Sequence, residues 1–409
     1  MVTLADIKAA AKLIDGQVLR TPLIPAPKLS ALTGADIFVK YENLQVTNAF
    51  KERGALVRLL HLSQDERARG VIAMSAGNHA QAVAYHAARL GIPATIVMPQ
   101  PTPLVKIENT ENQGARVVLS GETLAEAQAE AERLQHEQGF VFVHPFDDPH
   151  IIAGQGTIAL EMLDDRPDLD CLVVPVGGGG LIAGNAVAAK ALKPEIAVIG
   201  VEAALYASMT AALAGTEPRC GGQTLAEGIA VAKAGRLPLE IARERVDGMV
   251  QVSEAELERA VNAFLTLQKT MAEGAGAAGL AALIAEPERF KGRKVGLILA
   301  GGNIDPRILA SIMVRELQRQ GRIVSLRVTV PDRPGMLGRI ATCIGANGGN
   351  ILEVFHHRLF LHVPAQGTSL DLMIEVRDEA HTERVIAALR EEGFAVDVQP
   401  PGAADLASR

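Results

Sequence analysis

Residues 171–194, CLVVPVGGGGLIAGNAVAAKALKP, contain the pattern that decides the fold class. A run of apolar residues typical of a buried strand leads into four glycines, and an alanine-rich helical pattern follows. The same order of short strand, loop and longer helix recurs from about residue 70 to residue 320. Strands that alternate with helices in this way form parallel sheets covered by helices on both faces. We therefore expect an α/β fold whose ligands gather at the carboxyl ends of its strands.

The four glycines, Gly177 to Gly180, stand between that strand and the helix that begins near Leu181. Glycine lets backbone N–H groups converge on a ligand, and a helix N-terminus favours an anion. A phosphate cradle is the functional interpretation, and a flexible tight turn is the alternative. No Gly-Lys-Ser/Thr sequence follows the glycines, so the pattern differs from that of a nucleotide-binding P-loop.

The pattern changes near Arg319–Arg322, where a second domain is expected to begin. Beyond this point the sequence predicts a β-α-β-β-α-β order, which is ferredoxin-like and long enough to form its own module. We expect a first domain over 1–320, a second over 324–400 and a frayed tail over 401–409.

Composition excludes several classes of protein. The 409 residues carry a net charge of -7 and only 3% aromatic residues, and no basic block stands out, so nucleic acid and anionic membranes are not expected partners. There is no signal peptide pattern and no uncharged apolar run of about 18 residues. The three cysteines are far apart in the sequence, which favours a reducing cytoplasm.

Two further stretches could carry chemistry. TNAFKERGA (47–55) places Lys51 just before a helical pattern, either as a solvated surface lysine or as a lysine held for covalent chemistry. In SAGNHAQ (75–81), Ser75 and Asn78 either cap a helix or offer polar groups to a carboxylate or a phenolic oxygen. A lysine, a phosphate cradle and a polar loop together suit a phosphate-bearing aldehyde cofactor.

Two motifs favour structural interpretations. AEGAGAAG (272–279) contains G-x-G-x-x-G, but a helical pattern precedes it where a dinucleotide site needs a strand, so helix–helix or helix–ligand packing is expected. HPFDDPH (144–150) has two histidines and two aspartates, but its prolines and spacing favour a turn rich in helix caps. We therefore predict no metal site.

These motifs occur together in a known family. TNAFKERGA, SAGNHAQ, HPFDD, GQGT (154–157), PVGGGGL, AEGAGAAG and GGNID (301–305) stand in the order seen in fold-type II pyridoxal-phosphate enzymes. Over roughly residues 5–318 the chain resembles the threonine/serine dehydratases, also called threonine ammonia-lyases. The C-terminal module, with VTVPDRPGML (328–337) and GGNILEV (348–354), resembles an ACT domain. The resemblance implies a two-lobed catalytic domain like the tryptophan synthase β chain, with a smaller lobe of about residues 50–148 inserted in the larger lobe.

The resemblance also assigns roles to residues, which remain expectations at this point. Lys51 matches the lysine that forms a Schiff base with pyridoxal 5'-phosphate. The other expected cofactor contacts are Phe50, Asn78, Gly177, Gly178, Gly179, Gly180, Leu181, Glu273 and Ala300. The loop expected to receive the substrate carboxylate contains Ser75, Ala76, Asn78 and His79. In the ACT-like module, Asp332 and Asn350 are the expected effector-binding positions. The alternative is that DRPG is a capped turn and Asn350 a helix stop, with the module serving only assembly.

Three positions depart from relatives of this type. Ala300 stands where the family usually has a serine or cysteine that bonds the pyridine nitrogen. Ala76 stands where serine racemase has its second base, which favours elimination over racemisation. Glu202 matches a ligand of the racemases' divalent cation, but Ser208 stands where an aspartate would be.

The expected function is conversion of L-threonine to 2-oxobutanoate and ammonia, and of L-serine to pyruvate, in a cytoplasmic homodimer or homotetramer regulated by an amino acid. Alternatives are a dehydratase for serine or 3-hydroxyaspartate, a serine racemase-like enzyme, and an amino-acid sensor whose catalytic domain has decayed.

Overall fold

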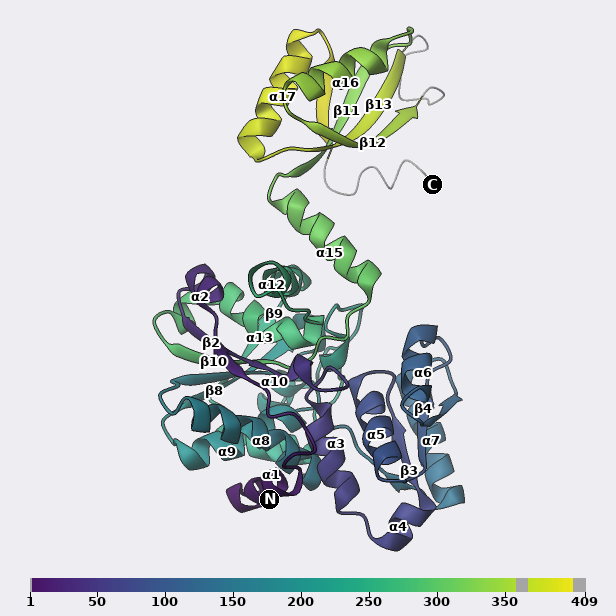
Figure 1. Cartoon of the computed structure of the whole chain (residues 1–409), viewed down its shortest axis with the longest axis vertical. Helices are drawn as coiled ribbons and strands as arrows, with labels where there is room; N and C mark the ends of the chain where they lie inside the picture. The colour runs from purple at the N-terminus through teal and green to yellow at the C-terminus, as the bar shows by residue number, and fades with distance from the viewer. Residues whose placement is uncertain (1, 358–366, 400–409) are drawn as a thin grey trace. The chain divides into compact units, whose positions relative to one another are not determined.

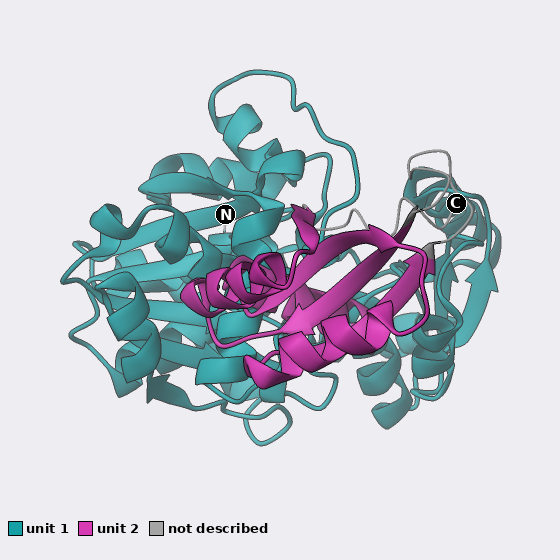
Figure 2. Cartoon of the chain, turned by 90° about the horizontal axis from the view of Figure 1, so that it is seen from above, with its two compact units in different colours: residues 1–304 teal, residues 305–409 magenta. Residues whose placement is uncertain are grey.

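The structure is a computed structural model that describes residues 2–357 and 367–399. It divides into two compact units, Met1–Ile304 and Asp305–Arg409, which Figure 2 colours separately. Each unit is described here by itself. The predicted tail over 401–409 lies outside the described residues.

The first unit contains a six-stranded sheet in the order β1-β2-β10-β7-β8-β9 (Figure 1). Its strands are β1 (Leu23–Pro25), β2 (Asp36–Tyr41), β7 (Cys171–Pro175), β8 (Ala197–Ala203), β9 (Gly248–Val252) and β10 (Lys294–Leu299). All neighbours are parallel except β1 and β2, whose antiparallel pairing the strand–helix pattern did not predict. The associated helices are α1 (Leu4–Leu13), α2 (Pro27–Thr33), α8 (Pro149–Asp165), α9 (Gly180–Leu192), α10 (Ser208–Leu213), α11 (Arg236–Arg245), α12 (Glu254–Leu267), α13 (Gly274–Ala285) and α14 (Pro287–Phe290), with short 3-10 turns η1 (Glu42–Leu44), η2 (Ala204–Tyr206) and η3 (Glu227–Ile229).

A second sheet of the first unit is formed by the chain that runs between β2 and β7. It is parallel throughout, in the order β5-β4-β3-β6. Its strands are β3 (Val71–Met74), β4 (Ala94–Met98), β5 (Arg116–Leu119) and β6 (Val141–Phe142), and its helices are α3 (Lys51–Leu60), α4 (Gln64–Arg69), α5 (Asn78–Arg89), α6 (Leu104–Glu111) and α7 (Leu124–Gln138). Each sheet has its own cluster of buried apolar residues, as expected for layers covered by helices.

The second unit confirms the predicted β-α-β-β-α-β order. After α15 (Pro306–Arg319) come β11 (Ile323–Pro331), α16 (Met336–Ala346), β12 (Asn350–His357), β13 (Gly367–Glu375), α17 (Glu379–Glu391) and β14 (Ala395–Gln399). The four strands form an antiparallel sheet in the order β12-β13-β11-β14. Its own apolar cluster joins the sheet to α16 and α17. Helix α15 belongs to this unit, whereas the predicted boundary placed it in the first domain.

Helix α3, which begins at Lys51, packs against both α5 and α8 and so lies between the two sheets of the first unit. Glycines make the α3–α8 contact close: a Cβ on Gly154 would lie 2.6 Å from Cα of Gly54. Any larger side chain at this crossing would force the helices apart. The abundance of small residues in the sequence therefore serves close helix packing around the lysine.

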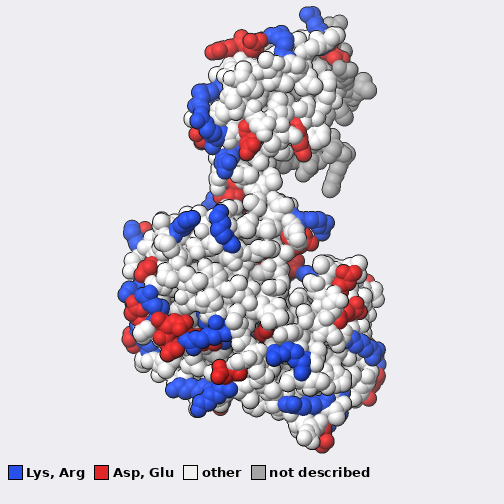
Figure 3. Space-filling view, viewed as in Figure 1, with Lys and Arg blue, Asp and Glu red and all other residues white. Residues whose placement is uncertain are grey.

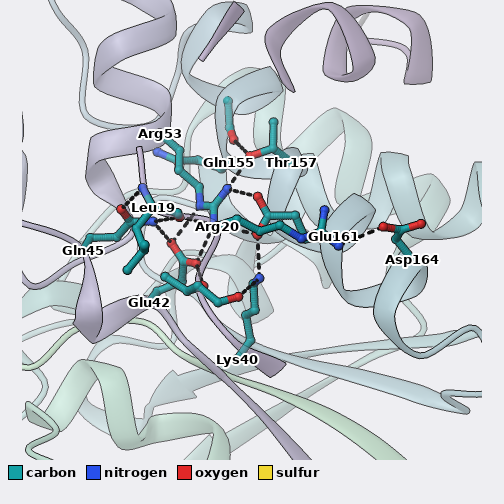
Figure 4. A network of polar contacts seen from close by, with 12 residues as sticks. Leu19, Arg20, Lys40, Glu42, Gln45, Arg53, Gln155, Thr157, Glu161 and Asp164 are labelled. Carbon is teal, nitrogen blue, oxygen red and sulfur yellow. Dashed lines mark hydrogen bonds and ion pairs between the residues drawn. The ribbon is translucent and has the colours of Figure 1, made fainter. Parts of the chain in front are cut away.

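A buried network of charged groups, shown in Figure 4, anchors α3. Arg53 is fully buried, and its guanidinium donates to both carboxylate oxygens of Glu42, each at 2.8 Å. It also donates to Glu161 on α8 at 2.6 and 2.9 Å. Lys40 on β2, also fully buried, donates to Glu161 at 2.5 Å and to the carbonyl of Thr21 at 2.5 Å.

The charges of this network balance, with two cations facing two carboxylates. Burial alone would lower the pKa of Arg53, but Glu42 and Glu161 outweigh it and raise that pKa. Burial lowers the pKa of Lys40 despite the same two carboxylates. A buried pair of this kind is sensitive to loss of one partner, because the other charge is then left without compensation in a medium of low polarity.

At the surface, in contrast to the buried network, positive and negative side chains are interspersed over a wide area. In the view of Figure 3, lysine and arginine side chains lie beside aspartate and glutamate side chains on both units. Among the described residues, no helix combines the length and apolarity that crossing a bilayer requires.

The network predicts that substitutions of two arginines of the first unit will differ greatly in the folding stability they cost. Arg53→Met should destabilise the folded state by about 3–5 kcal/mol, because the buried carboxylate of Glu42 would lose its guanidinium partner. Arg20→Ala is the matched control: Arg20 bonds Asp164 and Asp165, but its side chain is 53% exposed, so about 0–1 kcal/mol is expected. Denaturant unfolding followed by circular dichroism measures both. Equal shifts in the two variants would contradict a structural role for the network.

Candidate active site

The loop before Lys51 is attached to the end of β10. The N–H of Phe50 donates to the carbonyl of Ala300 at 3.0 Å, and Ala49 forms an isolated antiparallel bridge with Gly301. The N–H of Gly302 donates to the carbonyl of Asn48 at 3.0 Å. The lysine is therefore held at the carboxyl end of a central strand, where ligands of parallel sheets are bound.

The side chain of Lys51 lies in a largely buried and constrained setting. Its Nζ donates to the carbonyl of Pro145 at 2.7 Å and lies 5.2 Å from the centre of the Phe50 ring. Burial lowers the pKa of Lys51 to about 8, although the carboxyl group of Glu273 opposes this shift. A lysine amine with this pKa is neutral in an appreciable fraction of molecules near neutral pH, which a nucleophile or base requires. The surface-lysine alternative is therefore wrong.

The glycine stretch leads from β7 into α9, as predicted, and Gly179 is the N-cap with a φ of 95°. The absence of side chains on these glycines lets Phe146 pack closely against them. A Cβ on Gly178 would lie 2.3 Å from the ring of Phe146, and a Cβ on Gly180 would lie 2.9 Å from the carbonyl oxygen of Phe146. The first N–H groups of α9 lack partners within the helix. Gly177 to Leu181 therefore combine a close backbone approach with a helix N-terminus suited to an anion.

Residues 144–148 form the predicted turn rich in helix caps. Asp148 accepts from the N–H groups of His150 and Ile151 and caps α8. The two carboxylate oxygens of Asp147 accept from the N–H groups of Arg236 and Leu237, each at 2.9 Å, at the start of α11. His144 accepts through Nδ1 from the N–H groups of Phe146 and Asp147.

This turn has a role that the sequence did not indicate. Pro145 accepts from Lys51, and the next residue, Phe146, fills the space left by the glycines. Two segments separated by more than a hundred residues thus meet through a turn that was interpreted only as caps. The motif HPFDD was visible in the sequence, but nothing in its residue types indicated these contacts.

The loop after β3 brings Asn78 to the same place. Its Nδ2 donates to Oε1 of Glu273 at 2.7 Å, and its Oδ1 accepts from Asn303 at 2.8 Å. The capping alternative for Asn78 is wrong, because Asn78 is the first residue of α5 and the N-cap is Gly77, which makes no side-chain cap. The hydroxyl of Ser75 accepts from the N–H of Gly77 at 3.2 Å.

His79 follows Asn78 but is turned into the protein. Its ring is buried, and Nε2 lies 2.8 Å from the carbonyl of Val143. Burial and the nearby Lys51 lower the pKa of His79 to about 3, so the ring is neutral at physiological pH. Any contact of His79 with a substrate carboxylate would therefore come from its backbone N–H.

Glu273 is the N-cap residue of α13, and its N–H donates to the carbonyl of Gly301 at 3.1 Å. Burial raises the pKa of its carboxyl group to about 7, against the effect of the hydrogen bond from Asn78. The three glycines of G-x-G-x-x-G lie on α13, where a Cβ on Gly276 would meet the carbonyl oxygen of Gly301 at 2.2 Å. Gly276 thus packs α13 closely against the backbone after β10, where helix–helix or helix–ligand packing was predicted.

Two of the positions that were compared with relatives, Ala300 and Glu202, can be located in the structure. Ala300 is buried among core residues, and its methyl group offers no hydrogen bond to a ring nitrogen. Glu202 accepts from the N–H groups of Met209 and Thr210 and from the Thr210 hydroxyl at the start of α10. Among the described residues, no group of three or more His, Cys, Asp or Glu side chains is arranged to hold a metal ion.

The predicted effector positions lie in the second unit. Asn350 begins β12, and its Nδ2 donates to Glu375 at 3.4 Å. The alternative that Asn350 stops a helix is wrong, because α16 ends at Ala346 and its C-cap is Asn347. Asp332 stands in the bend after β11 and interacts with another group.

The residues of the first unit fit pyridoxal 5'-phosphate. A largely buried lysine with a lowered pKa suits the aldehyde, and a glycine stretch that a Cβ would block suits the phosphate. Asn78 and Glu273 supply polar groups from two other elements. Two surface cavities, of about 750 and 500 Å³, lie beside α1, and Lys51 lines neither of them.

The packing of Phe146 on the glycines predicts a compensating pair of variants. Gly178→Ala should lower cofactor affinity and the unfolding midpoint, because the added methyl group meets the Phe146 ring. Phe146→Ala in the same chain should restore part of the affinity. The control is Gly338→Ala on α16, where nothing lies within 4 Å of an added Cβ. Cofactor titration and thermal unfolding measure these effects, and unchanged affinity in Gly178→Ala would contradict the cradle.

Comparison with known proteins agrees with this geometry. Residues 14–301 match the family model described as pyridoxal-phosphate dependent enzyme, and residues 324–394 match the ACT domain. An L-threonine ammonia-lyase of Thermotoga maritima is 47% identical over 400 residues, which cover 97% of this chain and 100% of that protein.

Two solved structures are also similar. The threonine deaminase isoform 2 of Solanum lycopersicum, in its processed form, has 37% identity and a TM-score of 0.71, covering 76% of this chain and 86% of its own. A maize serine racemase has 32% identity and a TM-score of 0.72, covering 78% and 99%. With its largely buried lysine, its glycine stretch and its C-terminal antiparallel domain, the chain belongs to the pyridoxal-phosphate-dependent enzymes, among the threonine ammonia-lyases that carry an ACT domain.

Proposed function

We propose that this chain deaminates L-threonine to 2-oxobutanoate and ammonia, and also accepts L-serine to give pyruvate. The observation that carries the proposal is Lys51, a largely buried amine with a pKa of about 8 beside a glycine stretch and a bonded carboxamide–carboxyl pair. The sequence identity with threonine ammonia-lyases favours threonine among the β-hydroxy amino acids.

Pyridoxal phosphate, when bound, supplies the electron sink that makes the α-proton of an amino acid acidic. Lys51 would carry the cofactor and, once released by the substrate amine, accept the α-proton. Its lowered pKa keeps a fraction of the amine neutral for this step. The carbonyl of Pro145, which accepts from Nζ, gives the released amine a fixed position.

The remaining residues bind and orient. Gly177 to Leu181 would hold the phosphate through backbone N–H groups, with Phe146 excluding water from the other side. The loop from Ser75 to His79 would receive the substrate carboxylate through N–H groups, since the ring of His79 is neutral and engaged elsewhere. Phe50 would pack near the ring, because its position is fixed by the bond to Ala300.

Ala76 and Ala300 favour elimination over racemisation. Ala76 provides no group that could return a proton to the α-carbon from a second face. Ala300 leaves a ring nitrogen without a side-chain partner, which weakens the electron sink; loss of the β-hydroxyl tolerates this better than reprotonation does. Because the chain is also similar to the maize serine racemase, the assay of the products should include the D-amino acid that racemisation would give.

The ACT domain supports regulation by an amino acid, with Asp332 and Asn350 as proposed contacts. An effector changes activity only if it binds one state of the protein better than another. We also propose a homodimer or homotetramer, which light scattering would establish. The three free cysteines fit a cytoplasmic location.

Lys51→Ala should abolish ammonia release from threonine, because no other group at the site can carry the cofactor and accept the proton. The assay measures 2-oxobutanoate, pyruvate and D-amino acid with threonine, serine and 3-hydroxyaspartate as substrates. The control is Lys291→Ala, a lysine whose side chain is 66% exposed and which should leave turnover unchanged. Absence of turnover in the wild-type chain, with an amino acid still bound, would support the sensor alternative instead.

Thermal unfolding with and without isoleucine, valine, serine and threonine tests regulation. The effector should raise the midpoint of unfolding of the full chain, and Asp332→Ala and Asn350→Ala should reduce that rise with little effect on turnover at saturating threonine. The control is Arg384→Ala, because Arg384 is an exposed residue of α17, and this variant should preserve the shift. If neither Asp332→Ala nor Asn350→Ala changes it, the proposed effector contacts are wrong.

A further inference from the structure

Asn303 lies between the loop that carries Lys51 and the loop that carries Asn78. Its Nδ2 donates to the carbonyl of Thr47 at 2.9 Å and to Oδ1 of Asn78 at 2.8 Å. Its Oδ1 accepts from Nδ2 of Asn48 at 3.2 Å. One side chain thus bonds both loops from its place after β10, and neither the motif nor the resemblance had given it a role.

The orientation of these amides follows from the chemistry of their partners. The carbonyl of Thr47 can only accept, so the NH₂ end of Asn303 must face it. That end also faces Asn78, so Asn78 must turn its oxygen toward Asn303. The nitrogen of Asn78 is thereby directed to Glu273, to which it donates at 2.7 Å.

The Asn78 amide has one hydrogen-bond donor still available to a ligand. An amide nitrogen has two N–H groups, and one of them is used by Glu273. The oxygen is turned toward Asn303, so the one donor that remains for a ligand is the second N–H of Asn78. A phenolic oxygen carrying negative charge is the type of cofactor group that this donor stabilises.

Thr47 is fixed from its other side as well. Its N–H donates to the carboxylate of Glu52, which is fully buried on α3 next to Lys51. The backbone of Thr47, just before the helix that carries Lys51, is therefore held on both sides. Its N–H donates to Glu52 of that helix, and its carbonyl accepts from Asn303. Displacement of Asn303 would loosen the lysine loop and the orientation of Asn78 together.

We propose that Asn303 is a positioning residue that fixes the orientation of the Asn78 amide, so that an N–H rather than an oxygen faces the ring of the cofactor. The inference rests on the proposed cofactor site but not on which amino acid is the substrate. Asn303 acts through Asn78 and Thr47 and need not touch the cofactor.

Two variants test this in the full-length protein. Asn303→Ala removes both donated bonds. Asn303→Asp keeps the size of the side chain but presents only acceptors when ionised, so the nitrogen of Asn78 would turn toward it and the oxygen would face the ring. The readouts are cofactor affinity by equilibrium dialysis and the pH midpoint of the cofactor's visible absorption band without substrate.

Asn303→Ala should weaken cofactor binding roughly tenfold, the effect of about one lost neutral hydrogen bond. Asn303→Asp should weaken it more and shift the midpoint of the absorption band upward, because a carbonyl oxygen then faces a group that prefers a donor. Asn78→Ala should shift the midpoint in the same direction, and combining it with Asn303→Asp should add little.

Asn43→Ala is the matched control. Asn43 also uses its Nδ2 to bridge a loop, donating to Thr270 at 2.9 Å and to the carbonyl of Met271 at 3.0 Å, but it has no bond to Asn78. It should lower the unfolding midpoint without moving the absorption band.

Asn303 variants that behave like Asn43→Ala, with affinity and band unchanged relative to it, would overturn the proposal. If Asn303→Ala fails to fold, the isosteric Asn303→Asp decides by the same readouts. Failure of the wild-type chain to bind the cofactor would instead refute the proposed function, so the two failures are distinguishable.

Discussion

The contact of Arg53 with Glu42 and Glu161 is the constraint on which the position of Lys51 depends. Lys51 and Arg53 are two residues apart on α3, which places their side chains about 200° apart around the helix axis. Arg53 faces a buried set of opposite charges, while Lys51 faces Pro145 on the other side. Because a buried guanidinium must keep its partners, the network fixes the rotation of α3 and so the direction of the lysine.

Burial also explains why two groups at the site titrate far from their ordinary range. It lowers the pKa of Lys51 to about 8 and raises the pKa of Glu273 to about 7. Both groups therefore lose charge in part near neutral pH, for the same reason. Nζ of Lys51 donates to the carbonyl of Pro145, and the carboxyl group of Glu273 accepts from Asn78. Partial loss of charge by an amine and by a carboxyl group at one site is a property that acid–base chemistry uses.

Much of the fold could be predicted because it depends on local pattern. The apolar run before Gly177 and the alanines after it specify a strand and a helix wherever the segment lies, and the caps at Asp148 act within one turn. The antiparallel pairing of β1 with β2 could not be predicted, since a strand of three residues has no periodicity to recognise. The capping alternative for Asn78 is wrong because a cap needs the amide oxygen, and Oδ1 of Asn78 accepts instead from Asn303, a partner distant in sequence.

The sequence by itself determined the α/β class, the C-terminal antiparallel module, the glycine stretch and the lysine, because each is encoded by residues close to one another in the chain. Only the tertiary structure decided that Phe146 occupies the space above the glycines, that Arg53 anchors the lysine helix, and that Asn303 orients Asn78. These three contacts join residues of different elements. Their partners are selected by burial and hydrogen-bond complementarity, which depend on the packed fold and have no period along the sequence.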